Sequence, residues 1–174
     1  MASTGQKAKA TKRMKETVWQ GKKHWTVRFG ELARGRGRPS KIRPLFLAVG
    51  EKLPFEAIDK VRKHLISNKI PQRGVYIAHD SMGTPRYIGR GDIFGRLKTH
   101  HKTHIHELLY FSFFVVQDRM HEREVETLLI RAAGASLFFN DRKKRVDIAP
   151  GNVADYEAGT LFYERQHRKG RKKS

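Results

Sequence analysis

The chain has 174 residues, with 37 Lys and Arg against 17 Asp and Glu, and a formal net charge of +20. This excess favours a polyanionic partner, either a nucleic acid or an anionic membrane surface. The absence of cysteine excludes disulfides and Cys-ligated zinc or iron–sulfur sites, so any metal must be held by His, Asp, Glu or water. No apolar run approaches the ~20 residues that span a bilayer, and no apolar leader opens the chain. We therefore expect no membrane partner and an intracellular protein, cytoplasmic or nucleoid-associated.

Residues 1–44 form a strongly basic segment, with 13 Lys and Arg against two acids. We expect this arm to be partly disordered and to contact DNA. Within it, "TVWQGKKHWTVRFGEL" predicts a short hairpin around Gly21. The stretch "GRGRPSK" resembles the AT-hook core, whose arginines enter the narrow minor groove of AT-rich DNA. The alternative is a solvated basic loop that contacts phosphates, and in either case Arg36, Arg38 and Lys41 are candidate DNA-binding residues.

The middle of the chain opens with a predicted helix and a predicted hairpin. Apolar residues recur at helical spacing over residues 54–69, and Pro54 suits a first-turn position. "GVYIA" at 74–78 and "RYIG" at 86–89 predict two strands, because a polar segment rich in turn residues separates them.

A helix, a strand and a longer helix are predicted next. Residues 92–103 predict a short helix with Asp92 as its N-cap. "LYFSFFVVQD" at 109–118 is apolar nearly throughout and predicts a central strand. Residues 121–134 carry the clearest amphipathic helix pattern, with Gly134 as its stop. Residues 155–166 predict a late strand or a short helix.

This order predicts an α+β fold, namely a small three-stranded antiparallel sheet flanked by helices. We expect one domain over residues 45–163, preceded by the basic N-terminal arm and followed by a basic C-terminal tail over residues 164–174. The tail holds six Lys and Arg and one acid.

Several polar residues in these elements form an ordered set. Gly74-Val75-Tyr76 precedes Tyr87-Ile88-Gly89, and the two tyrosines are eleven positions apart. Further candidates follow in the later elements: Arg96, His100, Glu126 and Asn140. Over about residues 73–142 this set resembles the GIY-YIG nuclease family, with Val75 in place of the family's isoleucine.

The resemblance implies a metal-dependent DNA endonuclease, either of the sequence-specific restriction type or of a repair or homing type. It assigns Glu126 to one Mg²⁺ or Mn²⁺ and favours Tyr76 as the general base. It places Asn140 and Arg90 beside the phosphate. A restriction-type enzyme would cut double-stranded DNA as a homodimer.

The same residues fit phosphodiester hydrolysis on chemical grounds. The reaction needs a deprotonated water and neutralisation of the charge that grows on phosphate oxygens. The planar fork of Arg96 suits a phosphate, and a carboxylate such as Glu126 suits Mg²⁺. Tyr76 would need a lowered pKa to act as a base. Tyr87 and His100 either orient the water or take its proton themselves.

Three alternatives stay open at this point. His100 and His104 are spaced to offer two imidazoles to zinc. The chain could instead be a non-catalytic basic DNA- or RNA-binding protein that retains the fold. It could also be a basic RNA-binding or ribosome-associated protein in which the motifs are coincidental.

Overall fold

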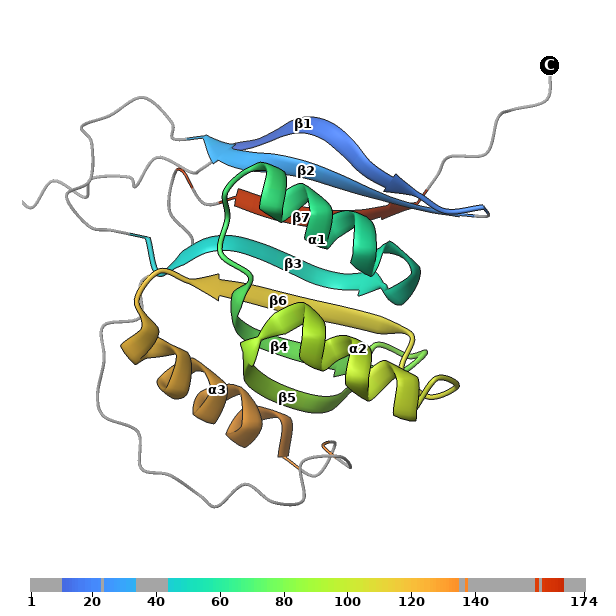
Figure 1. The fold of residues 1–174 in the computed structure, drawn as a ribbon, viewed down its shortest axis with the longest axis vertical. Coiled ribbons are helices and arrows are strands. Elements are labelled where there is room, and N and C mark those ends of the chain that lie inside the picture. Colours follow the sequence, from blue (N-terminus) through green and yellow to red (C-terminus); the bar gives the residue numbers. More distant parts are fainter. Residues whose placement is uncertain are drawn as a thin grey trace, which may run out of the picture.

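The computed structural model describes residues 11–22, 24–33, 44–134, 137, 159 and 161–167. Its main feature is a seven-stranded mixed sheet in the order β1-β2-β7-β3-β6-β4-β5 (Figure 1). The strands are β1 (Thr11–Gln20), β2 (Trp25–Ala33), β3 (Phe46–Pro54), β4 (Arg73–His79), β5 (Pro85–Asp92), β6 (Tyr110–Val116) and β7 (Leu161–His167). The prediction of a small three-stranded sheet flanked by helices is therefore wrong.

The predicted hairpin and central strand form one end of this sheet. β4 pairs antiparallel with both β5 and β6. The sheet then continues, because β3 pairs antiparallel with β6 and parallel with β7. β7 pairs in turn with β2, and β2 with β1. Residues 11–33, which the sequence placed in the basic arm, thus pair in the same sheet as the tyrosine strands.

Three α-helices pack on this sheet, and a 3-10 turn at Phe55–Ala57 leads into the first: α1 (Ile58–Ser67), α2 (Ile93–Thr103) and α3 (Arg119–Ala133). The Asp92 carboxylate accepts a hydrogen bond from the Gly95 backbone N–H at 3.3 Å, so Asp92 is the predicted N-cap of α2. Gly134 follows α3 with φ of 55°, a positive value that favours glycine at a helix stop. None of the helices among the described residues is both long enough and apolar enough to cross a bilayer.

The helices cover opposite faces of the sheet. Successive side chains of a strand point to opposite faces, and β4 divides in this way. Tyr76 and Ala78 belong to a core cluster with residues of α1 and α2. Val75 packs instead in a second cluster, which contains Val125 of α3. Figure 1 shows α1 over β7 and β3, and α2 over β4.

Candidate active site

Two tyrosines and a histidine form a ring stack at the β4–β5 end of the sheet. Tyr76 of β4 lies 5.9 Å from Tyr87 of β5 between ring centroids, and the rings are nearly parallel. The imidazole of His100 on α2 lies 3.8 Å from the Tyr87 ring. Three of the predicted site residues therefore meet on the face that α1 and α2 cover.

Gly89 is the residue that lets Tyr76 lie across β5. The two residues are partners in the β4–β5 register. A Cβ added at Gly89 would lie 2.4 Å from the Tyr76 hydroxyl oxygen and 2.9 Å from a ring carbon of Tyr87. No side chain fits between these rings. Position 89 therefore requires glycine because of the packed tyrosines, and not because of a turn.

The Tyr76 hydroxyl is buried and lacks a well-formed hydrogen bond. The residue has 0% exposure, and its oxygen has no hydrogen-bond partner of proper geometry among the described residues. Tyr87 and Arg96 lie near enough to influence it. Burial, reinforced by Tyr87, raises the pKa of the Tyr76 hydroxyl far above its ordinary value, while Arg96 opposes that rise. Burial therefore works against Tyr76 as the proton acceptor in the free protein.

The pKa of His100 is shifted in the opposite direction to that of Tyr76. Burial lowers the pKa of its imidazole, and the nearby His104 and Arg96 lower it further. The side chain is half-buried, so the ring is neutral near pH 7 and retains contact with solvent. A neutral imidazole with solvent contact can accept a proton.

Arg96 extends this cluster toward solvent. It is exposed on α2, and its Nε would lie 3.5 Å from a Cβ at Gly91, a β5 residue with φ of +118°. Arg96 thus lies near both the Tyr76 hydroxyl and the end of β5. Its guanidinium is available to an incoming phosphate, because no ion pair holds it among the described residues.

Glu126 lies on the other face of β5. It is 5% exposed on α3, and its Oε2 accepts a hydrogen bond from Arg90 Nε at 3.1 Å. Arg90 follows Gly89 along β5, so its side chain points away from the tyrosine stack. The structure brings Arg90 and Glu126 together and brings the tyrosines, Arg96 and His100 together. Because β5 is the last strand of the described sheet, both groups border the same edge.

Glu122 is a buried carboxylate to which the sequence analysis gave no role. It lies one helical turn before Glu126 and is only 2% exposed. Arg73 Nε approaches its Oε1 at 3.3 Å, while its Oε2 is buried without a hydrogen-bond partner. The i, i+4 spacing on α3 is the signal that could have indicated it, since residues so spaced share one helix face.

Glu126 and Glu122 are the carboxylates at this edge that could hold a divalent cation, and each is ion-paired with an arginine in the structure. Mg²⁺ commonly binds through one or two carboxylates and keeps several waters, and Glu126 is a buried carboxylate beside β5. Among the described residues no three His, Asp or Glu side chains converge as a metal cage.

The predicted zinc alternative lacks a third ligand among the described residues. The His104 Nδ1 atom lies 3.7 Å from a carboxylate oxygen of Glu107.

Four predicted site residues lie outside the described part of the chain: Asn140, Arg36, Arg38 and Lys41. Their predicted roles stay predictions.

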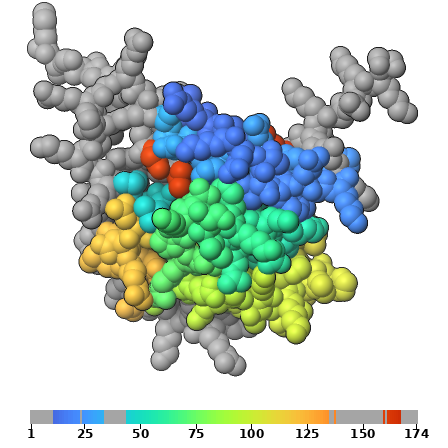
Figure 2. Space-filling view, turned by 45° about the horizontal axis from the view of Figure 1, so that its top comes forward, coloured from blue at the N-terminus to red at the C-terminus, as the bar shows by residue number. Residues whose placement is uncertain are grey.

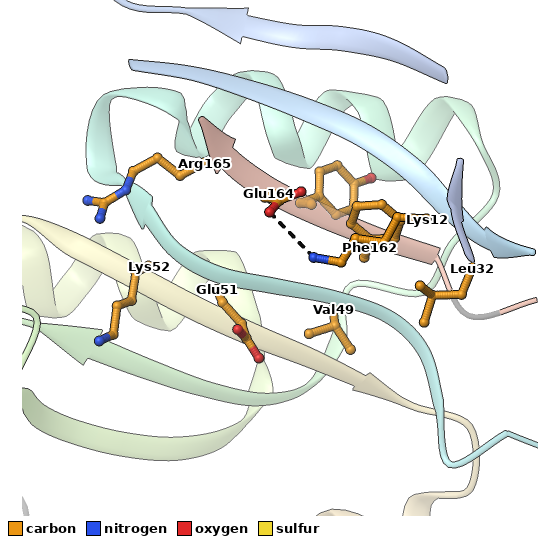
Figure 3. A pocket seen from close by; sticks show the side chains of 9 residues that line it. Lys12, Leu32, Val49, Glu51, Lys52, Phe162, Glu164 and Arg165 are labelled. Carbon is orange, nitrogen blue, oxygen red and sulfur yellow. Dashed lines mark hydrogen bonds and ion pairs between the residues drawn. The ribbon is translucent and has the colours of Figure 1, made fainter. Parts of the chain in front are cut away.

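A cavity of about 280 Å³ lies elsewhere, on β1, β2, β3 and β7 (Figure 3). Phe162, Val49 and Leu32 give it an apolar lining, and Lys12 pairs across it with Glu164 at 3.4 Å. None of its lining residues belongs to the tyrosine stack or to the Arg90–Glu126 pair. This cavity is therefore separate from the candidate site.

Comparison with known proteins identified no matching family model, no similar curated protein and no similar solved structure.

Proposed function

We propose that the chain is a divalent-metal-dependent endonuclease that hydrolyses phosphodiester bonds of DNA at the β5 edge. The observation that carries the proposal is the stack of Tyr76, Tyr87 and His100 beside an exposed Arg96. These groups supply a hydroxyl donor, a proton acceptor and a phosphate-binding cation within one small region. The net charge of +20 supports a nucleic-acid substrate.

In this proposal each side chain acts through the property described above. The attacking water lies against the solvent-facing edges of Tyr87 and His100. His100 takes the proton, because burial, His104 and Arg96 lower the pKa of its imidazole, and the ring is therefore neutral and able to accept a proton. Tyr76 remains protonated, and its buried hydroxyl lies beside Tyr87 and Arg96, where it positions these two side chains rather than contacting the water. This assignment moves the base role from Tyr76 to His100.

The remaining groups stabilise charge on the phosphate. Arg96 offers a planar fork to two phosphate oxygens. A cation bound at Glu126 would supply Lewis-acid stabilisation of the growing negative charge. Arg90 orients the Glu126 carboxylate through its hydrogen bond, as outer-shell partners commonly do for metal ligands. Sequence-specific cleavage of both strands by a homodimer belongs to the same proposal.

Supercoiled plasmid incubated with Mg²⁺ or Mn²⁺ tests this function. Wild type should nick or linearise the plasmid, and EDTA should abolish the cleavage. Arg96→Ala should lower the rate strongly, whereas Arg123→Ala should leave it unchanged, because Arg123 is exposed on α3 away from the stack. If no DNA substrate, random-sequence libraries included, is cut with any divalent metal, the enzyme proposal is wrong.

A non-catalytic DNA- or RNA-binding protein is the second candidate, and two observations favour it. The Glu126 carboxylate is already held by Arg90, and burial makes the Tyr76 hydroxyl harder to ionise. In that case Tyr76→Phe and Glu126→Gln would leave nucleic-acid affinity unchanged, and no cleavage would appear.

A further inference from the structure

The helices on the two faces of the sheet carry different charge. α1 and α2 together hold six cationic residues and one acid, Asp59. The cations are Lys60, Arg62, Lys63, Arg96, Lys98 and Lys102. α3 holds three arginines and three glutamates. Arg73 and Arg90 pair with two of those glutamates. With these two arginines included, the α3 side has a formal net charge of +2, compared with +5 for α1 and α2.

The cations of α1 and α2 are positioned for a ligand that lies across both helices. Lys98 of α2 is ion-paired with Asp59 of α1, which ties the two helices together. Lys60, Lys63 and Lys102 are exposed and form no ion pair with another described residue. Figure 2 shows β1, α1 and α2 on one continuous surface. We define the α1–α2 face as the exposed surface of these two helices.

We propose that the α1–α2 face is the surface along which the backbone of a DNA duplex lies, with the phosphate to be cleaved at the β5 edge. This inference rests on the proposed function for the identity of the partner. Arg96 belongs to the α1–α2 face and also borders the tyrosine stack, so one continuous surface leads from α1 to the site. The less positive outer surface of α3 then faces away from the duplex, while Glu126 borders the β5 edge from the inner side of that helix.

The dimensions of the sheet agree with this placement. α1 lies over β7 and β3, and the sheet order places β5 four strand intervals beyond β7. At about 4.8 Å per interval this is roughly 19 Å. One strand of B-DNA carries a phosphate every ~3.4 Å, so the distance corresponds to about five or six phosphates. The face therefore provides roughly one cation for each phosphate of one strand.

Salt-dependent binding to a 20-base-pair duplex tests the proposal, measured by fluorescence anisotropy in EDTA so that no cleavage occurs. The triple variant K60Q/K63Q/K102Q removes three charges from the α1–α2 face. The matched control R119Q/R123Q/R131Q removes three exposed charges from α3. All six side chains are exposed, so both variants should fold, which thermal unfolding by circular dichroism verifies.

The expected result is a difference in salt dependence. Log affinity falls with log salt by about 0.9 for each neutralised phosphate. The α1–α2 variant lacks three cations, so the slope of log affinity against log salt should be shallower by up to ~2.7 than in wild type. Between about 50 and 200 mM salt, wild type should weaken on the order of 40-fold more than this variant. The α3 control should keep a slope within about one unit of wild type.

Equal slopes for the two variants, or a greater loss in the α3 control, would overturn the proposal. It would also be wrong if the α1–α2 variant lost binding to anionic lipid vesicles but kept wild-type binding to the duplex. A failure of the proposed function looks different. In that case the slopes would differ as expected in EDTA, yet no substrate would be cut when metal is added.

Discussion

The imidazole of His100 lies against the phenol ring of Tyr87, with 3.8 Å between ring centroids, although the two residues belong to α2 and β5. The contact removes part of the solvent around the imidazole, and burial is the largest cause of its lowered pKa. A residue that the sequence analysis assigned either to orienting the water or to taking its proton is thus neutral near pH 7, as a general base must be.

The pH dependence of cleavage tests which group accepts the proton. A base must be unprotonated, so the rate rises with pH through the pKa of that base and is then flat. With His100 as the base, the rising limb should lie below the ordinary histidine value of about 6.5, because the pKa of His100 is lowered. His100→Gln should lose at least about 100-fold in kcat. A rate that keeps rising between about pH 8 and 10, and that Tyr76→Phe or Tyr87→Phe flattens, would assign the proton to a tyrosine instead.

Gly89→Ala should disrupt the stack itself. The added methyl carbon would lie 2.4 Å from the Tyr76 hydroxyl oxygen and 2.6 Å from its ring carbon Cζ, so Tyr76 or β5 must move. Overpacking of this kind costs about 1–3 kcal/mol of unfolding free energy, measurable by urea denaturation, and cleavage should fall with it.

Tyr76→Phe in the Gly89→Ala background provides the control. It removes the oxygen at 2.4 Å and should recover part, though not all, of the lost stability, because the Cζ contact remains. Strictly additive effects of the two substitutions would contradict the proposed clash.

The strands and helices around the site were predictable from sequence, because short stretches of residues determine where each of them begins and ends. The short apolar run of "GVYIA", the cap at Asp92 and the stop at Gly134 each depend on a few neighbouring residues. The family resemblance also placed Tyr76, Tyr87 and His100 in one site, and their rings contact one another in the structure.

The extent of the sheet was not predictable in this way. β1 carries an exposed, charge-rich sequence with little apolar alternation, as befits the outermost described strand. β7 inserts between β2 and β3 although more than 100 residues separate it from either strand. No local pattern encodes such a pairing. The sequence also did not show that Arg90 and Glu126 lie on the opposite face of the sheet from the tyrosines. This separation depends on which face each helix packs against.

Glu122 and Glu126 allow a matched test of the metal-ligand assignment. Both are buried on α3 and both are paired with an arginine, so each Glu→Gln change removes one charge from a similar environment. Glu126→Gln should lower metal-dependent cleavage at least about 100-fold, because it removes the proposed ligand. Glu122→Gln should mainly change the free energy of unfolding.

Mn²⁺ binding, followed by electron paramagnetic resonance, gives a readout that does not depend on cleavage. Weakened Mn²⁺ binding is expected for Glu126→Gln alone. Equal weakening in both variants would make Glu122 a second ligand, and unchanged binding in both would remove the cation from this edge.

His79 should make the stability of the fold depend on pH. Its Nδ1–H donates to the Gly83 carbonyl oxygen at 3.1 Å, so its Nε2 accepts from the Ser112 hydroxyl at 2.8 Å. The Ser112 oxygen in turn accepts from the Lys52 backbone N–H at 2.8 Å. Protonation of Nε2 would break this chain, and burial lowers the pKa of His79 to about 4. The folded protein therefore holds a neutral His79, whereas the unfolded chain takes up a proton near pH 6.5.

The resulting stability is fully present above about pH 6.5 and is lost as the pH falls toward 4. Linkage between these two pKa values gives a loss of about 2 kcal/mol between pH 7 and pH 5. Urea unfolding at both pH values should show this loss in wild type and a loss smaller by about that amount in His79→Gln, which cannot titrate there. If the two proteins lost equal stability on acidification, His79 would not be the group responsible. The Ser112 hydroxyl would then not depend on a neutral imidazole.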